Sequence, residues 1–335
     1  MNINQMKASI AKFRKADLSV IKDEKLRAKG HKLQAKQKGF TLLELLVVIA
    51  LLAVIATGAL IAYENVGDNA QAAAGANSAA TIDRAIRTYK AVEGNYPNQW
   101  DNLAVDSAAS AVPFLPEASL SFLAAWDTSA ATSASLRNAF VNAGIEELQT
   151  INGTGALDPD VSPNRAHNES TNPGDGVTTG ATEVEMESPD NELPGFLSVI
   201  PNKVCNFESY PTNTFDNTSF TSNQIQNSYA DLLEGDECHA VVALGFGGDA
   251  AASTALSNVA IAQSPTYARQ GVVNPEEEYS RFIGLFLVGT EDEDNAGQWE
   301  YLESARLLAV IATDGENIDS LNALAAAGQS GGDDD

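Results

Sequence analysis

Residues 40–63 read FTLLELLVVIALLAVIATGALIAY and form the longest apolar run of the chain. These 24 residues include a single charged side chain, that of Glu44. A helix over this stretch would be about 36 Å long, which is enough to cross a hydrocarbon core of about 30 Å. An ordinary secretory signal has an apolar run of only about 7 to 15 residues. The stretch therefore predicts a membrane-spanning helix, and hydropathy alone leaves open that it is an uncleaved single-pass anchor.

Charge is distributed unevenly on the two sides of this stretch. Residues 1–39 contain 11 Lys or Arg and 3 Asp or Glu, and the rest of the chain contains 9 basic and 42 acidic side chains. Because basic segments beside a membrane helix stay in the cytoplasm, we expect residues 1–39 inside and the acidic body outside the inner membrane. The acidic body would repel phosphates, which argues against nucleic-acid binding through it.

Residues 1–39 are predicted to be a basic cytoplasmic leader. A solvated basic tail is the favoured interpretation. The alternative is a short amphipathic helix on the inner leaflet, since Met6, Ile10 and Phe13 recur at helical spacing.

Glu44 lies five residues into the apolar run. A charged residue at mid-bilayer costs about 2.5–3.5 kcal/mol, less near an edge, and usually pairs with an opposite charge. Residues 40–63 contain no Lys, Arg or His. Cleavage between Gly39 and Phe40 would create an α-amino group one helical turn from Glu44. In a staggered array of such helices, each carboxylate could also meet the amine of a neighbour.

Residues 38–44, KGFTLLE, with the long apolar helix after them, resemble the prepilin processing site of type IV pilins and type II secretion pseudopilins. The resemblance implies that a prepilin peptidase cuts after Gly39 and methylates Phe40, and that Glu44 pairs with a subunit amine during assembly. It also implies identical or homologous pilin subunits and an inner-membrane assembly platform as partners. The final location would be an extracellular pilus or a periplasmic pseudopilus.

The resemblance extends weakly to residues 85–97, AIRTYKAVEGNYP, which are similar to the end of the long first helix in these families. It thus covers about residues 36–100. The 39-residue leader is long for the family, the proline that many pilins carry midway along the membrane helix is absent, and 296 residues after the leader are about twice the usual length of a major pseudopilin.

The implied function is that of a structural filament subunit and not of an enzyme. One alternative is a minor pilin or a pseudopilin whose large head binds a substrate, a surface or another subunit. Another is a membrane-tethered enzyme, which would require a pocket of converging titratable groups.

The rest of the chain predicts an α+β fold, with the first helix packed on a C-terminal antiparallel sheet. An apolar stripe over residues 64–93 continues the first helix, and residues 94–335 form an acidic head. Two short helices are expected within residues 103–150 and a long polar loop at 152–194. Strands are expected at residues 240–246, 281–288 and 300–313, with a terminal helix at 314–327.

Two further features of the head concern a disulfide and a metal site. Cys205 and Cys238 lie in the part expected to be exported, where a disulfide over 34 residues would contribute about 3 to 4 kcal/mol. Acidic runs offer oxygen ligands for calcium, but none fits the twelve-residue loop template, and a solvated acidic surface is favoured. The calcium candidates are Asp292, Asp294, Asp314 and Asp319. We expect no catalytic residues.

Overall fold

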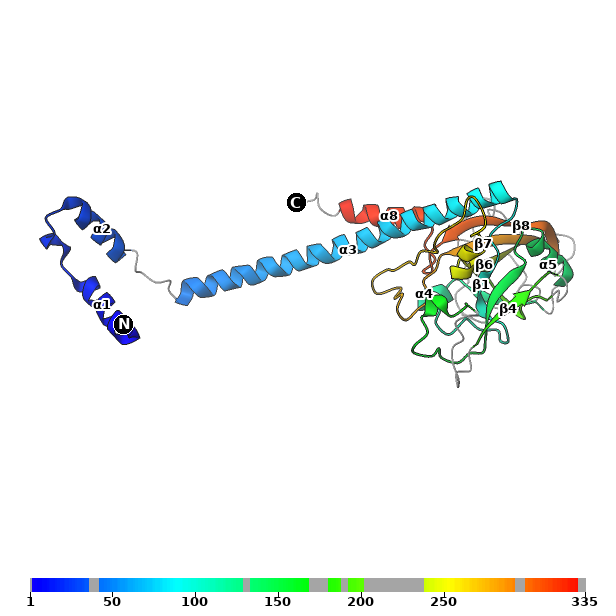
Figure 1. The fold of residues 1–335 in the computed structure, drawn as a ribbon, viewed down its shortest axis with the longest axis horizontal. Coiled ribbons are helices and arrows are strands. Elements are labelled where there is room, and N and C mark those ends of the chain that lie inside the picture. Colours follow the sequence, from blue (N-terminus) through cyan, green and yellow to red (C-terminus); the bar gives the residue numbers. More distant parts are fainter. Residues whose placement is uncertain are drawn as a thin grey trace. The chain divides into compact units, whose positions relative to one another are not determined.

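The computed structural model describes residues 2–35, 42–128, 133–168, 180–187, 192–201, 238–292 and 299–330 (Figure 1). The chain divides into two compact units, residues 1–64 and residues 65–335. In the first unit, residues before the apolar run form α1 (Ile3–Lys15), a 3-10 turn η1 (Leu18–Val20) and α2 (Glu24–Ala35). These residues therefore form helices whose side chains are mostly exposed, and both a solvated leader and one lying on the inner leaflet stay predictions.

Helix α3 (Leu42–Glu93) includes the whole described part of the apolar run and continues into the second unit. It ends where the sequence predicts, because Gly94 has a φ of 83° and its N–H donates to the carbonyl of Lys90 at 3.0 Å. A glycine adopts this left-handed conformation without the steric cost of a Cβ, and so it terminates the helix cheaply.

The second unit contains one eight-stranded sheet. Its strands are β1 (Trp100–Val105), β2 (Ala124–Asp127), β3 (Glu147–Asn152), β4 (Gly180–Glu185), β5 (Phe196–Val199), β6 (His239–Gly245), β7 (Ile283–Glu291) and β8 (Trp299–Ile311). Strand β6 pairs with β7 on one side, and β7 pairs with β8. On its other side β6 pairs with both β5 and β1. Strand β5 pairs in turn with β2, while β1 pairs with β3 and β3 with β4. All pairs are antiparallel except β1 with β3, so the sheet is mixed.

The sheet separates two apolar layers. Successive side chains of a strand point to opposite faces, and in β6 Val242 and Leu244 join the cluster under the helices, whereas Val241 and Ala243 join the opposite cluster. The helical layer includes α3 from Ala76 onward and α5 (Ser133–Val141), and Leu321 near the end of the chain joins it. The opposite layer comes from the connections at 112–123 and 157–166, which include α4 (Glu117–Leu120) and η2 (Pro163–Arg165).

The predicted α+β class is confirmed, with β6, β7 and β8 at the expected strands and α8 (Ile318–Ser330) near the expected terminal helix. Strands β1, β2, β3 and β5 lie outside the predicted strands. The predicted polar loop at 152–194 contains β4, which pairs with β3 over six residues from Glu147 to Asn152. A short helix α7 (Gly248–Ala252) follows β6.

Candidate functional site

The first candidate site is the start of α3. Gly39 and Phe40 lie outside the described residues, so cleavage and methylation there stay predictions. Helix α3 begins at Leu42 and carries Glu44 in its first turn. A carboxylate in the first turn interacts favourably with the positive end of the helix dipole. A carboxylate is therefore favourably placed at this end of the helix.

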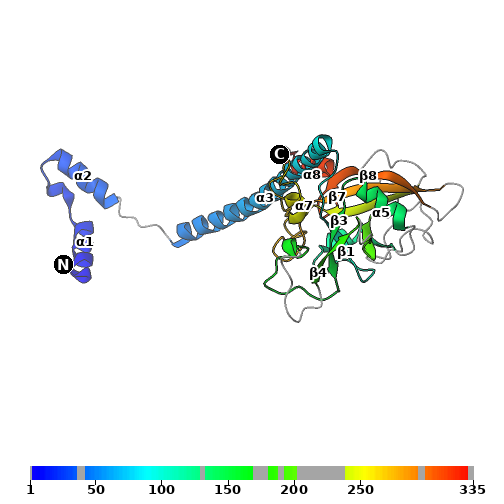
Figure 2. The same ribbon diagram turned by 45° about the vertical axis from the view of Figure 1, so that its right-hand side comes forward.

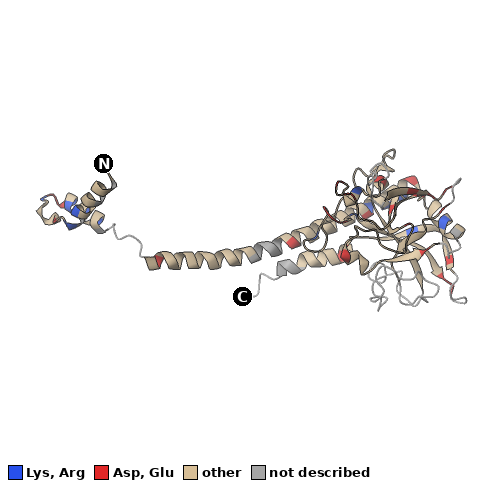
Figure 3. Cartoon of the chain, turned by 90° about the horizontal axis from the view of Figure 1, so that it is seen from below, with Lys and Arg blue, Asp and Glu red and all other residues tan. Residues whose placement is uncertain are grey.

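The residues that follow form one apolar surface. Leu42–Leu60 is long and apolar enough to cross a membrane, and none of its side chains is buried within the chain. Figure 3 shows this part of α3 uncharged apart from an acidic residue near its start. The Thr57 hydroxyl donates to the carbonyl of Ala53 at 2.9 Å, so this polar group is satisfied inside the helix. An uncovered apolar surface of this size needs lipid or other helices around it.

The later part of α3 is fixed to the sheet of the second unit. The small and branched residues of one stripe are buried, namely Ala72, Ala76, Ala79, Ile82 and Ile86. Arg87 extends this attachment, because its guanidinium holds Asp83 at 2.9 Å and donates to the carbonyl of Leu308 in β8 at 2.9 Å. Gly75 allows a close approach, since a Cβ there would lie 2.7 Å from the Tyr267 ring.

The end of α3 and the turn after it include residues 85–97, the segment of the weak resemblance, and their contacts are structural. The Tyr96 hydroxyl accepts from the Leu307 N–H at 3.1 Å, and the Lys90 ammonium lies 4.7 Å from the Tyr96 ring centroid. The Trp100 indole donates to the carbonyl of Pro97 at 2.6 Å. The turn thereby ties the end of α3 to β1 and β8, and this is a structural function.

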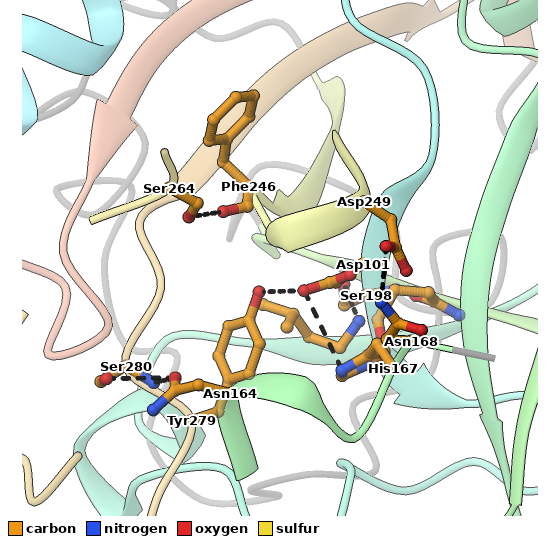
Figure 4. Close-up of polar contacts among 12 residues, drawn as sticks. Asp101, Asn164, His167, Asn168, Ser198, Phe246, Asp249, Ser264, Tyr279 and Ser280 are labelled. Carbon is orange, nitrogen blue, oxygen red and sulfur yellow. Dashed lines mark hydrogen bonds and ion pairs between the residues drawn. The ribbon is translucent and has the colours of Figure 1, made fainter. Parts of the chain in front are cut away.

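A buried polar cluster around Asp101 of β1 forms the second candidate (Figure 4). The Tyr279 hydroxyl donates to Asp101 at 2.7 Å, and the His167 Nδ1 atom lies 4.0 Å from the same carboxylate oxygen. The other ring nitrogen of His167 is 2.8 Å from the carbonyl of Asn102. A carbonyl only accepts, so this nitrogen carries the proton and donates.

Burial dominates the electrostatics of this cluster. It raises the pKa of Asp101, against the opposing effects of His167 and of the Tyr279 hydrogen bond, and it raises the pKa of Tyr279 far above its ordinary value. The side chains of Asp101 and His167 are each at most 4% exposed. A general acid or base must contact its substrate, and these side chains are buried. The contacts of the cluster instead join β1 to the connecting segments that carry His167 and Tyr279.

A second polar cluster joins the segment after β8 to the loop that precedes β7. Asp314 accepts from the Tyr267 hydroxyl at 2.7 Å and from Arg269 at 3.1 Å, and Arg269 also lies 3.4 Å from Glu316. Burial and the Asp314 carboxylate raise the pKa of Tyr267, so its hydroxyl remains a donor. This cluster lies beside α3, where Gly75 faces Tyr267.

The calcium candidates are dispersed among different surroundings. Asp314 belongs to the cluster with Tyr267, Asp319 lies in the first turn of α8, and Asp292 follows β7. Asp294 lies outside the described residues. Over the described ranges, no group of three or more His, Cys, Asp or Glu side chains is arranged to hold a metal.

Only one cysteine of the predicted disulfide lies within the described residues. Cys238 is buried next to Trp299 and is not a free thiol. Cys205, the other cysteine of the chain, lies outside the described residues. Pairing of Cys205 with Cys238 therefore stays a prediction.

Sequence reasoning missed both polar clusters. Asp101, His167 and Tyr279 are separated by more than 60 residues along the chain, and nothing in their local sequence indicates that they meet. The signal available was an acidic residue directly after Trp100, at the start of a segment rich in apolar residues. That signal is compatible with an exposed position as well as a buried one.

Comparison with known proteins gives one match, which covers the start of α3. A family model described as the prokaryotic N-terminal methylation motif matches residues 34–60. This motif is the hallmark of type IV pilins and pseudopilins, and the match coincides with the start of α3 and its apolar part. No curated protein and no solved structure matches the chain.

Proposed function

We propose that this chain, which carries the N-terminal motif of type IV pilins and pseudopilins, is a structural subunit of a type IV pilus-like filament. The precursor is anchored by Leu42–Leu60 with its amino terminus in the cytoplasm. A prepilin peptidase cuts after Gly39 and methylates Phe40. The subunit then leaves the membrane by packing its apolar helix against those of other subunits, with an inner-membrane assembly platform as a further partner.

The observation that supports this proposal most is the overlap of the motif at 34–60 with a helix whose apolar surface is uncovered. Lipid covers such a surface in a single membrane protein, and neighbouring helices cover it in a helical bundle. A helix that is exposed all round suits a subunit that exchanges one environment for the other. Glu44 then has a specific role, because its carboxylate selects the neighbour that presents a positive amino terminus.

The first test is mass spectrometry of the mature amino terminus from the native cells. We expect a chain that begins with methylated Phe40 and has lost residues 1–39. Gly39→Val should leave the precursor uncut, because a branched side chain at the cleavage position blocks the peptidase. Recovery of the native protein with Met1 still attached would contradict the proposal.

The second test concerns assembly. We compare Glu44→Gln, which removes the charge in the apolar part of α3, with Asp68→Asn, which removes one carboxylate from the exposed surface of the same helix. Glu44→Gln should lower the amount of subunit in sheared filaments, and Asp68→Asn should leave it unchanged. Normal incorporation of Glu44→Gln would refute charge pairing. The abundance of the subunit in these fractions also separates a major subunit from a minor one.

A further inference from the structure

The leader folds on itself before the membrane helix begins. The Leu18 side chain is buried against Gly30, where a Cβ would lie only 2.9 Å from a Leu18 methyl. The Gln34 amide in α2 donates to the carbonyls of Phe13 and Ala16 at 2.9 and 3.2 Å. These contacts join the ends of α1 and α2. The leader is therefore a small helical hairpin with a defined outer surface.

That outer surface carries apolar side chains on one face of α1. Met6, Ile10 and Phe13 follow one another at spacings of four and three, so they share a face of the helix, and they are 48%, 40% and 38% exposed. Helix α2 adds Leu26 and Leu33, which are 57% and 56% exposed. Among the large apolar side chains described in residues 2–35, only Leu18 is buried. The main apolar face of the hairpin therefore remains uncovered.

Basic residues accompany this face. Residues 1–39 contain 11 Lys or Arg against 3 Asp or Glu, and Figure 3 shows the basic residues gathered on α1 and α2. Lys12 and Lys15 lie on the side of α1 away from the apolar stripe. An amphipathic helix with an apolar face and a basic polar face is the type that lies in the interface of an anionic bilayer.

The length of the connection decides where the hairpin can be. From Ala35, the last residue of α2, to Leu42, the first residue of α3, there are seven residue steps, which span at most about 25 Å when fully extended. The hairpin is thus held within about 25 Å of the beginning of the membrane helix. Tethering at this distance raises the effective concentration of the hairpin at the membrane surface, so that a modest affinity for anionic lipid suffices for docking.

We propose that the leader hairpin docks on the anionic cytoplasmic leaflet, with Met6, Ile10 and Phe13 inserted at the level of the acyl chains and the basic residues at the phosphates. Docking holds the segment around Gly39 at the membrane surface, where a membrane peptidase would meet it. The inference rests on the membrane anchor and the cytoplasmic amino terminus of the proposed function. It depends on neither cleavage nor filament assembly.

The test uses the full-length precursor in nanodiscs of phosphatidylcholine alone or with about 40% phosphatidylglycerol, a content that gives an anionic surface. Hydrogen exchange is followed by mass spectrometry for the amides of α1. We expect exchange to be slower by about tenfold or more in the anionic nanodiscs, since docking adds protection to that of the hairpin itself. The added protection should decrease at 0.5 M salt, a concentration at which surface charges are screened over about 4 Å.

Two variants make the test specific. Ile10→Ser with Phe13→Ser should abolish the added protection. The matched control is Ala8→Ser with Ala11→Ser on the opposite face, which costs at least as much helix propensity and should retain the protection. Equal exchange in the two kinds of nanodisc would overturn the proposal, and so would protection that survives loss of the apolar pair. Neither result depends on whether the chain is cleaved in cells.

Discussion

Replacing Ile86 by Ala should destabilise the second unit strongly, because this residue joins α3 to the sheet. Ile86 is completely buried in the apolar layer between α3 and the strands. Truncating a fully buried Ile to Ala usually costs about 2–5 kcal/mol, through lost transfer free energy and the cavity that remains. The cluster to which Ile86 belongs includes large rings and branched side chains of the strands, and such a packed layer relaxes little, so we expect about 3 kcal/mol or more.

The effect can be measured on the full chain in detergent by denaturation with guanidinium. Trp100, Trp126 and Trp299 all lie in residues 65–335, so tryptophan fluorescence reports unfolding of that unit only. With a slope of about 5 kcal/mol per molar, a loss of about 3 kcal/mol lowers the midpoint by about 0.6 M. The expected change is well above the uncertainty of such a measurement.

Val92→Ala is the matched control, because Val92 lies in the same helix and is 57% exposed. Its substitution should change the free energy of unfolding by less than about 0.5 kcal/mol. If Ile86→Ala and Val92→Ala shifted the midpoint equally, the attachment of α3 to the sheet would be wrong. A large shift for Ile86→Ala alone would support it.

Three further outcomes follow from the head. Since burial raises the pKa of Asp101, the carboxylate stabilises the fold less as the pH rises from about 4, its unfolded-state pKa, towards the folded-state value. The change in denaturation midpoint caused by Asp101→Asn should therefore be more favourable at pH 8 than at pH 5, and an equal change at the two pH values would contradict this. Tyr267→Phe should cost about 1.5–3 kcal/mol in the same assay, because it removes a hydrogen bond to the buried carboxylate of Asp314, and a neutral effect would show that the bond is unimportant. Denatured, unreduced protein should resist alkylation at Cys205 and Cys238, whereas labelling of both thiols would reject the disulfide.

The sequence was informative wherever a segment is apolar along its length. The apolar part of α3 follows from composition, and the end of α3 follows from the glycine at position 94. Strands β6 and β7 are buried on both faces, so they read as continuous apolar runs, and these are recognisable without knowledge of their partners. The local pattern and the final structure agree in these elements.

Other elements depend on partners that are distant in the chain. The side chains of β4 are half-buried or exposed, and this strand exists because its backbone pairs with β3 in register from Glu147 to Asn152. The parallel pairing of β1 with β3 requires residues 100–105 and 147–152 to meet, which no local pattern specifies. The two candidate sites differ in the same respect. Its motif is contiguous and visible in the sequence, whereas Asp101, His167 and Tyr279 become neighbours only in the folded sheet.

Helix α8 lies beside α3 in the second unit, as Figures 1 and 3 show, and Leu321 of α8 comes within 3.7 Å of the Cβ position at Gly75 (Figure 2 gives a further view). The later part of α3, which we call the stem of the head, is thus covered on one side by α8. A stem of this kind is not equivalent in all directions, because copies can approach only its open sides. Any regular array built from it would inherit a fixed lateral order of neighbours from the side of α3 that α8 covers.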